Sequence, residues 1–207
     1  MRALNSELTG KVVLVTGASG GIGSAIARQF VREGAKLVLH YRRGRTPAMA
    51  LRRELKGTQA LVCGADLSSE LQVKRLFGKT IKQFGRIDTL IVNAGSWETR
   101  DVPLRKMTLR QWRGTMDGVL TTAFLSLREF LRVVARQKEG NAVLIASTAG
   151  VFGEAGHADY ASGKAAMAYG LTRSLKNEIA RLAPHRRDYC ADSQGGRSIR
   201  AVRFSDD

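Results

Sequence analysis

Short apolar runs rich in β-branched residues alternate with longer amphipathic stretches along most of the chain. β-Strands are predicted for five of these runs, at residues 11–16, 36–40, 59–63, 88–92 and 141–146. Helices are predicted for the stretches that follow them, at residues 22–33, 47–56, 69–84, 108–136 and 158–182. Because most of the strands are apolar on both faces, they indicate a parallel sheet covered on both sides. With right-handed crossovers, the prediction is an α/β fold with a doubly wound parallel sheet.

The pattern changes after residue 184. Residues 185–207 hold five arginines, four aspartates and only the scattered apolar residues Ile199, Val202 and Phe204. We predict one domain over residues 1–184, followed by an atypical tail over residues 185–207 for which disorder is one interpretation. The sheet is then truncated after the helix that follows its fifth strand, and the open edge of that strand invites pairing with another chain or instability.

A glycine-rich segment, Thr-Gly-Ala-Ser-Gly-Gly-Ile-Gly at residues 16–23, lies between the first predicted strand and the first helix. Glycines there permit a tight turn and a close approach of the backbone to a pyrophosphate, whose charge the helix N-terminus favours. Taken alone, the segment also fits a strand-to-helix turn with no ligand. Its position after the first strand favours a cofactor site that includes Gly17, Ser19, Gly21, Ile22 and Gly23.

The end of the second strand bears on which nicotinamide cofactor is used. Residues 40–45 read His-Tyr-Arg-Arg-Gly-Arg, with three arginines and no carboxylate. An acidic residue would bind the adenosine ribose, whereas arginine offers a planar fork for a 2′-phosphate, so NADP(H) is favoured and NAD(H) stays open. Arg42 is the predicted phosphate ligand, and a solvated basic turn is the alternative. The predicted site also includes Tyr41, Leu67 and Asp66, which could reach the adenine amino group or cap a helix.

Tyr160 and Lys164 lie four residues apart, on one face of the last predicted helix. A phenol with a pKa near ~10 is a poor acid–base catalyst until a nearby cation stabilises its phenolate, and Lys164 can supply that charge. Ser147, at the end of the fifth strand, could hold a substrate carbonyl for protonation by Tyr160. A Tyr–Lys pair alone is common on helix surfaces, but the glycine-rich segment and Ser147 make catalysis the better interpretation. Trp97 is predicted to pack or to flank the substrate cleft, and His157 to lie in a loop or to touch substrate.

Together these motifs resemble the short-chain dehydrogenases/reductases over residues 8–184. The matching segments, in the family's order, are residues 16–23, Asn93-Ala94-Gly95, Ile-Ala-Ser at 145–147 and Tyr-Ala-Ser-Gly-Lys at 160–164. The sequence looks most similar to the branch that contains 3-oxoacyl-acyl-carrier-protein reductases. The resemblance implies a Rossmann fold, a nicotinamide cofactor and reversible hydride transfer between a carbonyl and an alcohol. It also implies these roles: acid–base chemistry for Tyr160, activation and ribose binding for Lys164, carbonyl binding for Ser147, and cofactor contacts for Asn93, Ala94 and Gly95.

Two departures from the family's pattern qualify this expectation. The family commonly has a catalytic Asn in the long helix, where it holds a water in a proton relay, and Val119 stands at that position. An isopropyl group can neither donate nor accept a hydrogen bond, so we expect slower or differently routed proton exchange unless a water or Thr121 substitutes. After residue 184 the family continues into a sixth strand, a Pro-Gly loop over the nicotinamide, a substrate-covering helix and a seventh strand, and residues 185–207 do not match that pattern.

Two explanations for the tail stay open. Residues 193–197, Ser-Gln-Gly-Gly-Arg, can be encoded by bases that in another frame encode Pro-Gly-Trp-Thr, as expected for a frame-shifted end of a longer reductase. The alternative is a naturally truncated or partner-completed chain. The main prediction is therefore a short-chain oxidoreductase that uses NADP(H). The alternative is a catalytically weak or inactive module that binds a dinucleotide or a partner.

Charge and composition narrow the partners. The 207 residues carry a formal net charge of +16, which suits nucleic acid or an acidic carrier protein. Nucleic acid is disfavoured because the sequence has no helix-turn-helix, RNP or zinc-finger pattern and only 6% aromatic residues. Two cysteines and three poorly spaced histidines predict no metal, and the lack of a signal peptide or membrane-spanning run predicts a cytoplasmic protein. The family resemblance adds a small carbonyl or alcohol substrate, free or carrier-bound, and a homodimer or homotetramer.

Overall fold

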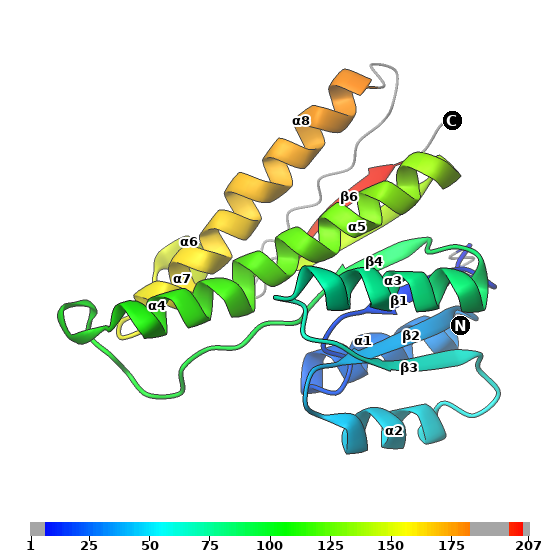
Figure 1. The fold of residues 1–207 in the computed structure, drawn as a ribbon, viewed down its shortest axis with the longest axis horizontal. Coiled ribbons are helices and arrows are strands. Elements are labelled where there is room, and N and C mark those ends of the chain that lie inside the picture. Colours follow the sequence, from blue (N-terminus) through cyan, green and yellow to red (C-terminus); the bar gives the residue numbers. More distant parts are fainter. Residues whose placement is uncertain (1–6, 183–198, 205–207) are drawn as a thin grey trace, which may run out of the picture.

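A central sheet organises the chain. The computed structural model describes residues 7–182 and 199–204. The strands are β1 (Val12–Val15), β2 (Lys36–Tyr41), β3 (Ala60–Gly64), β4 (Thr89–Val92), β5 (Gly140–Ile145) and β6 (Ile199–Phe204). Their order across the sheet is β3-β2-β1-β4-β5-β6, and the first five run parallel (Figure 1). The predicted α/β, doubly wound parallel sheet is confirmed.

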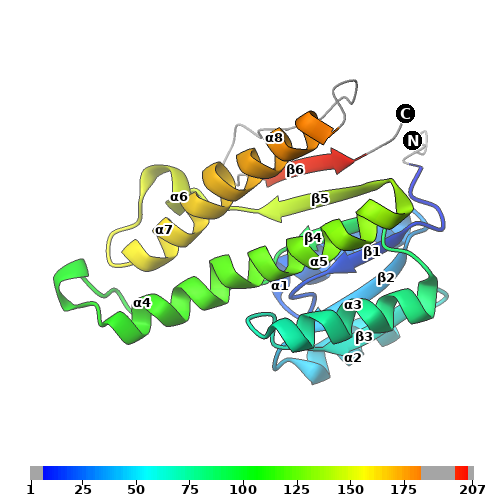
Figure 2. The same ribbon diagram turned by 45° about the horizontal axis from the view of Figure 1, so that its top comes forward.

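Helices cover both faces of this sheet. They are α1 (Gly21–Arg32), α2 (Arg45–Glu54), α3 (Glu70–Phe84), α4 (Leu109–Met116), α5 (Thr122–Gln137), α6 (Ala149–Phe152), α7 (Ala158–Ala165) and α8 (Thr172–Leu182). α1 and α2 pack on one face, and α3 and α5 pack on the other (Figure 2). The buried surfaces of β1 and β4 face helices on both sides, which explains their continuous apolar sequences.

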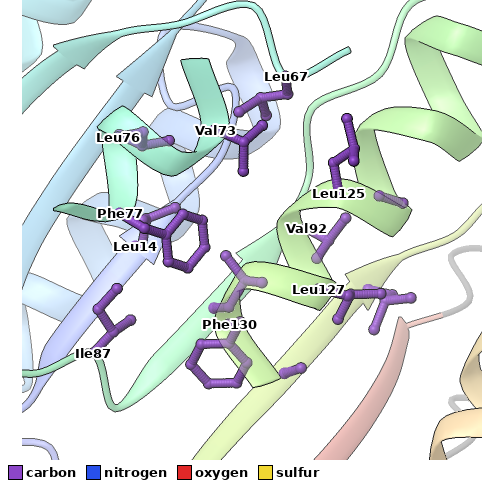
Figure 3. Close-up of a cluster of buried hydrophobic side chains, with 14 of the residues drawn as sticks. Leu14, Leu67, Val73, Leu76, Phe77, Ile87, Val92, Leu125, Leu127 and Phe130 are labelled. Carbon is purple, nitrogen blue, oxygen red and sulfur yellow. The ribbon is translucent and has the colours of Figure 1, made fainter. Parts of the chain in front are cut away.

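The larger apolar core lies between α3, α5 and the sheet (Figure 3). Phe77 of α3 and Phe130 of α5 fill the space over Leu14 of β1 and Val92 of β4, and all four side chains are buried. Each such side chain contributes about 1.5–3 kcal/mol when it leaves water. This core fixes the carboxyl ends of β1 and β4, which is where the glycine-rich segment and residues 93–95 begin.

The sixth strand corrects the prediction that the tail contains none. β6 pairs antiparallel with β5 from Gly140 opposite Phe204 to Ile145 opposite Ile199. The edge of β5 offers a row of backbone donors and acceptors, so a segment with scattered apolar residues can pair there through its main chain. The other predictions for the tail, including disorder and a shifted reading frame at 193–197, fall on residues outside those that the structure describes.

Two long predicted helices are each divided by a π-helical turn. The stretch 108–136 consists of α4, a π turn η2 (Asp117–Thr121) and α5, and the stretch 158–182 consists of α7, a π turn η3 (Ala166–Leu171) and α8. Such turns are frequent at functional sites because they redirect backbone and side chains within a helix. Both turns flank the region where Tyr160 and Lys164 lie. The short elements α6 and η1 (Leu104–Lys106) were not predicted.

The sheet is less completely covered at β5 than at β1. Alternate residues of β5 are buried and half-buried, whereas every residue of β1 and β4 is buried. α1 and α2 pack against β1, β2 and β3, so Val143 and Ile145 of β5 are only partly covered on that face of the sheet.

Over the described ranges, 7–182 and 199–204, no helix has the length and apolar character needed to cross a membrane.

Candidate active site

Two cavities meet at the carboxyl ends of the parallel strands. The larger, of about 580 Å³, is of the size that holds a cofactor or drug-sized ligand. It is lined by most of the predicted cofactor residues, namely Gly17, Ser19, Gly21, Ile22, Gly23, Arg42, Leu67, Asn93, Ala94, Gly95, Tyr160 and Lys164. Tyr41 and Asp66 do not line it, and Ser147 lines the smaller cavity instead.

The glycine-rich segment packs too tightly for side chains at two positions. Gly17 has a φ of +65°, where L residues are strained, and a Cβ there would lie 3.1 Å from Cα of Ala94. At Gly23 a Cβ would collide with the carbonyl oxygen of Gly17 and lie 2.8 Å from Nδ2 of Asn93. The backbone of this segment therefore forms the floor of the larger cavity, close enough for a phosphate to approach its amides.

Thr16 and Asn93 join the segment to the end of β4. The buried Thr16 hydroxyl donates to the carbonyl of Ile91 at 2.9 Å and accepts from the amides of Asn93 and Ala94 at 2.9 and 3.0 Å. Nδ2 of Asn93 donates to the carbonyls of Thr16 and Gly17 at 2.9 and 3.2 Å. Asn93 thus supports the cavity floor as well as lining the cavity, a role that the sequence did not show.

His40 is a second supporting residue that sequence reasoning missed. Its buried Nδ1 accepts from the Gly17 amide at 3.0 Å, so Nε2 carries the proton and donates to the carbonyl of Ala65 at 2.9 Å. Burial lowers the pKa of His40, which keeps it neutral and preserves this pattern. The imidazole therefore ties the glycine-rich segment to the end of β3. The signal was its place at the end of β2, among apolar residues.

The N-terminus of α1 offers backbone amides that can bind an anion. Gly20 precedes the helix without a side-chain cap, and the first turn contains no acidic residue, so its amides are free of competing side-chain acceptors. Arg42 and Arg43 line the same cavity. Nη2 of Arg42 lies 2.7 Å from Oδ2 of Asp66.

Asp66 serves here as a partner of Arg42 and as a local cap. Burial alone would raise the pKa of Asp66, but hydrogen bonds from Ser68 and the charge of Arg42 together lower it. Its Oδ1 accepts from the Ser68 amide at 3.0 Å and from the Ser68 hydroxyl at 2.7 Å. The ionised carboxylate therefore holds the guanidinium at the cavity rim. Adenine binding by Asp66 stays a prediction.

Tyr160 and Lys164 stand at the junction of the two cavities. Tyr160 lines both, and Ser147 lines the smaller one, of about 290 Å³. Burial raises the pKa of Tyr160, and a hydrogen bond with Ser147 offsets part of that rise. Nζ of Lys164 lies 5.7 Å from the centre of the Tyr160 ring and donates to the carbonyl of Ile145 at 2.7 Å. Burial lowers the pKa of Lys164 to about 8.

These shifts differ from the expectation that Lys164 lowers the pKa of Tyr160. The lysine is only 4% exposed, so burial makes its own charge costly, and the phenol is partly buried as well. Both groups are therefore in their protonated forms at pH 7. A protonated phenol beside Ser147 has the chemistry needed to give a proton to a carbonyl oxygen.

Val119 occupies the η2 turn next to α7. It is buried, and a Cβ on Gly163 would lie 3.3 Å from its Cγ1, so the side chain packs against the helix that carries Tyr160. Thr121, the suggested substitute, donates its hydroxyl to Oδ1 of Asp117 at 3.1 Å. Thr122 donates to the carbonyls of Gly118 and Val119, both at 3.0 Å. The polar group expected at this position is thus absent, and Thr121 is engaged elsewhere.

Asp159 fixes the N-terminal end of α7 and was not predicted. Its buried carboxylate accepts from the Thr115 hydroxyl at 2.7 Å, from Nε2 of Gln111 at 3.2 Å and from the Tyr160 amide at 2.8 Å. These bonds join α4 to α7 directly beside Tyr160. A negative charge in the first turn of a helix also favours the helix dipole.

The wall of the smaller cavity contains Trp97. Its indole stacks on His157, with ring centres 4.4 Å apart, and tilts over Tyr160 at 5.5 Å. His157 is buried and does not line the cavity, and its ring packs on the indole of Trp97. Within the part of the chain that the structure describes, no three His, Cys, Asp or Glu side chains are placed to hold a metal ion.

Comparison with known proteins agrees with this geometry. The model of the short chain dehydrogenase family matches residues 11–183. The chain is 37% identical over 177 residues to a 3-oxoacyl-[acyl-carrier-protein] reductase of Synechocystis sp., an alignment that covers 84% of this chain and 70% of the relative. It is 34% and 33% identical, over 172 residues, to the FabG reductases of Staphylococcus aureus and Staphylococcus epidermidis, with 82% of this chain and 69% of each relative covered. The chain belongs to the short chain dehydrogenase family.

Proposed function

We propose that the protein is an NADP(H)-preferring oxidoreductase that reduces a carbonyl compound, or oxidises the matching alcohol. The observation that carries this proposal is the position of Tyr160, which lines both the cavity suited to a dinucleotide and the smaller cavity beside Ser147. A nicotinamide cofactor supplies or takes the hydride when bound. The crowded glycine floor, the uncapped start of α1 and the two arginines fit such a group.

Each residue has a defined part in the proposed reduction. Ser147 holds the substrate oxygen by donating a hydrogen bond. Tyr160 gives its phenolic proton to that oxygen while the carbonyl carbon receives the hydride, so the products are the alcohol and a phenolate. The protonated Lys164 stabilises that phenolate by its charge, and the phenol regains a proton from solvent. In the reverse direction Tyr160 removes the proton from the alcohol.

Arg42 is the proposed ligand for the 2′-phosphate. It lines the larger cavity and keeps donors free besides the one that Asp66 occupies. We expect Arg42→Ala to weaken NADPH binding about ten- to a hundredfold while NADH binding changes little, because a hydrogen bond to a charged group is worth about 1.5–3 kcal/mol. Titration of cofactor fluorescence measures both affinities. Arg53→Ala, on the exposed side of α2, is the matched control for loss of a positive charge; equal losses in both variants would assign the effect to net charge.

A catalytically weak dinucleotide-binding module is the second candidate. The buried Val119 favours it, because no polar side chain stands where a relay would be needed to return a proton to Tyr160. The two candidates differ in turnover and agree in cofactor binding. Preferential NADPH binding without NADPH oxidation on a broad panel of ketones would favour the module. Failure to bind either NADPH or NADH, in protein shown to be folded, would contradict both candidate functions.

Partner proposals follow from the relatives and from the exposed charge. The relatives' names specify 3-oxoacyl-[acyl-carrier-protein] substrates. Exposed cationic side chains near η1 and in α4, at Arg105, Lys106, Arg110 and Arg113, would favour an acidic carrier. A free small carbonyl compound is the other substrate class. A cytoplasmic location and a homodimer or homotetramer complete the proposal, and light scattering of the purified protein tests the latter.

A further inference from the structure

The smaller cavity has one bulky wall. Its lining consists of short residues and backbone, apart from Trp97, Glu154 and Tyr160. Its volume of about 290 Å³ lies at the lower end of the ~300–1,000 Å³ typical of ligand pockets. Tyr160 carries the proposed chemistry, and Trp97 is the bulkier of the other two large side chains. Its position over Tyr160 limits how much substrate can extend beside the reacting carbonyl.

Trp97 is held from behind. The residue is 50% exposed, so the stack on His157 supplies a large part of the contacts that fix the indole. His157 is only 4% exposed, and its Nε2 lies 3.0 Å from Oδ1 of Asp101, so the ring donates to that carboxylate. Ring stacking and a hydrogen bond to a charged acceptor both restrict the orientation of the imidazole.

A backbone hydrogen bond also joins the segments that carry Trp97 and His157. The Val102 amide donates to the carbonyl of Gly156 at 2.9 Å, which joins the segment that carries Trp97 to the segment that carries His157. Gly156 has a φ of +78°, and a Cβ there would lie 2.8 Å from Cβ of Asp101. The close approach therefore depends on glycine. Asp101, His157 and Trp97 form one connected support that ends over Tyr160.

We propose that Trp97 is the specificity-determining residue of the substrate cavity, that His157 and Asp101 are its positioning residues, and that the cavity selects compact carbonyl compounds over extended ones. This inference rests on the proposed carbonyl reduction at Tyr160. It also distinguishes this chain's substrate from the 3-oxoacyl-[acyl-carrier-protein] substrates that its relatives' names specify. The fixed position of the Trp97 indole limits the size of the substrate that the cavity accepts.

The test compares cyclohexanone, as the compact ketone, with 2-octanone, as the extended one. We expect wild-type kcat/KM with NADPH to favour cyclohexanone, and Trp97→Ala to reduce that preference at least about tenfold, mainly through the KM for 2-octanone. His157→Ala should move the preference in the same direction by a smaller factor. His157→Phe, which retains a ring for stacking but loses the hydrogen bond to Asp101, should keep more of the preference than His157→Ala and less than the wild type. Trp112→Phe is the control for loss of an indole elsewhere.

A second readout does not depend on turnover. The sequence has two tryptophans, so the indole N–H signals in a ¹⁵N spectrum are assigned by Trp112→Phe. Saturable movement of the Trp97 signal by cyclohexanone, at lower concentrations than by 2-octanone, supports the inference even in protein that turns over neither ketone. An unchanged ketone preference in Trp97→Ala, or equal movement of the signal by both ketones, overturns it. Failure of NADPH binding would overturn the proposed function alone.

Discussion

The two cavities that share Tyr160 are built in different ways. The floor of the larger cavity is backbone, held by hydrogen bonds that involve the buried Thr16 and His40 and the partly buried Asn93. The smaller cavity is walled by side chains of connecting segments, and its Trp97 is half exposed. Close packing of backbone admits few residue types, whereas a side-chain wall admits many. The half of the site that we propose for the cofactor is therefore constrained by the fold more strongly than the half that we propose for the substrate.

The phenol of Tyr160 lines both cavities, and its removal should have the largest effect on turnover. We expect Tyr160→Phe to lower kcat for carbonyl reduction by about 10²–10⁴-fold, because the proton donor is lost while the ring and its contacts remain. NADPH affinity should change little. Steady-state kinetics and cofactor titration measure the two effects. Tyr169→Phe provides the matched loss of a hydroxyl; an equal loss of turnover in that variant would contradict the role of Tyr160.

Adding one carbon to the cofactor floor tests how closely it is packed. Gly23→Ala places a Cβ against the carbonyl oxygen of Gly17 and within 2.9 Å of Cα of Ala18, and backbone atoms have little room to move. We expect a loss of about 1–3 kcal/mol in the free energy of unfolding, together with weaker NADPH binding. Denaturant unfolding checks this. Gly78→Ala in α3 meets nothing within 4 Å and should stabilise instead; similar behaviour of both variants would remove the packing argument.

The buried cation at the junction makes stability depend on pH. The folded pKa of Lys164 is about 8, below its ordinary value of 10.5, so the unfolded chain binds more protons between these two pH values. The contribution of Lys164 to the free energy of unfolding of the wild type therefore rises with pH, by about 2 kcal/mol between pH 7 and pH 9.5. Lys164→Met should lack that rise while losing turnover. Urea unfolding at both pH values measures it, and parallel curves for the two proteins would contradict the burial of a charged lysine.

Substitution of exposed residues on α6 should have little effect on the free energy of unfolding. Phe152 of α6 is 84% exposed, and we expect Phe152→Ala to alter the free energy of unfolding by less than about 0.5 kcal/mol. The matched change Phe77→Ala in the core should cost about 3–5 kcal/mol. Thermal or urea unfolding compares the pair. A large loss for Phe152→Ala would show that this surface is covered in solution.

The sequence predicted the fold and the residues that line the larger cavity better than those that line the smaller one. The strands β1 and β4 have uninterrupted apolar residues, and the glycines at 17 and 23 stand where only glycine fits, so local patterns predicted both. The stack of Trp97 on His157 joins two segments that lie about sixty residues apart in the sequence, a contact that no local pattern encodes. β6 was missed because its pairing with β5 depends on an open edge elsewhere in the sheet.

The late position of β6 in the chain has a consequence for biosynthesis. Residues 146–198 separate β5 from the strand that covers its edge. At roughly 5–20 residues per second, a ribosome needs about 3 to 10 seconds to make them. During that interval β5 presents an unpaired edge while the rest of the parallel sheet can already have formed, and open edges of this kind recruit strands from other molecules. The yield of the protein in a cell should therefore depend on translation speed and on chaperones that shield nascent chains.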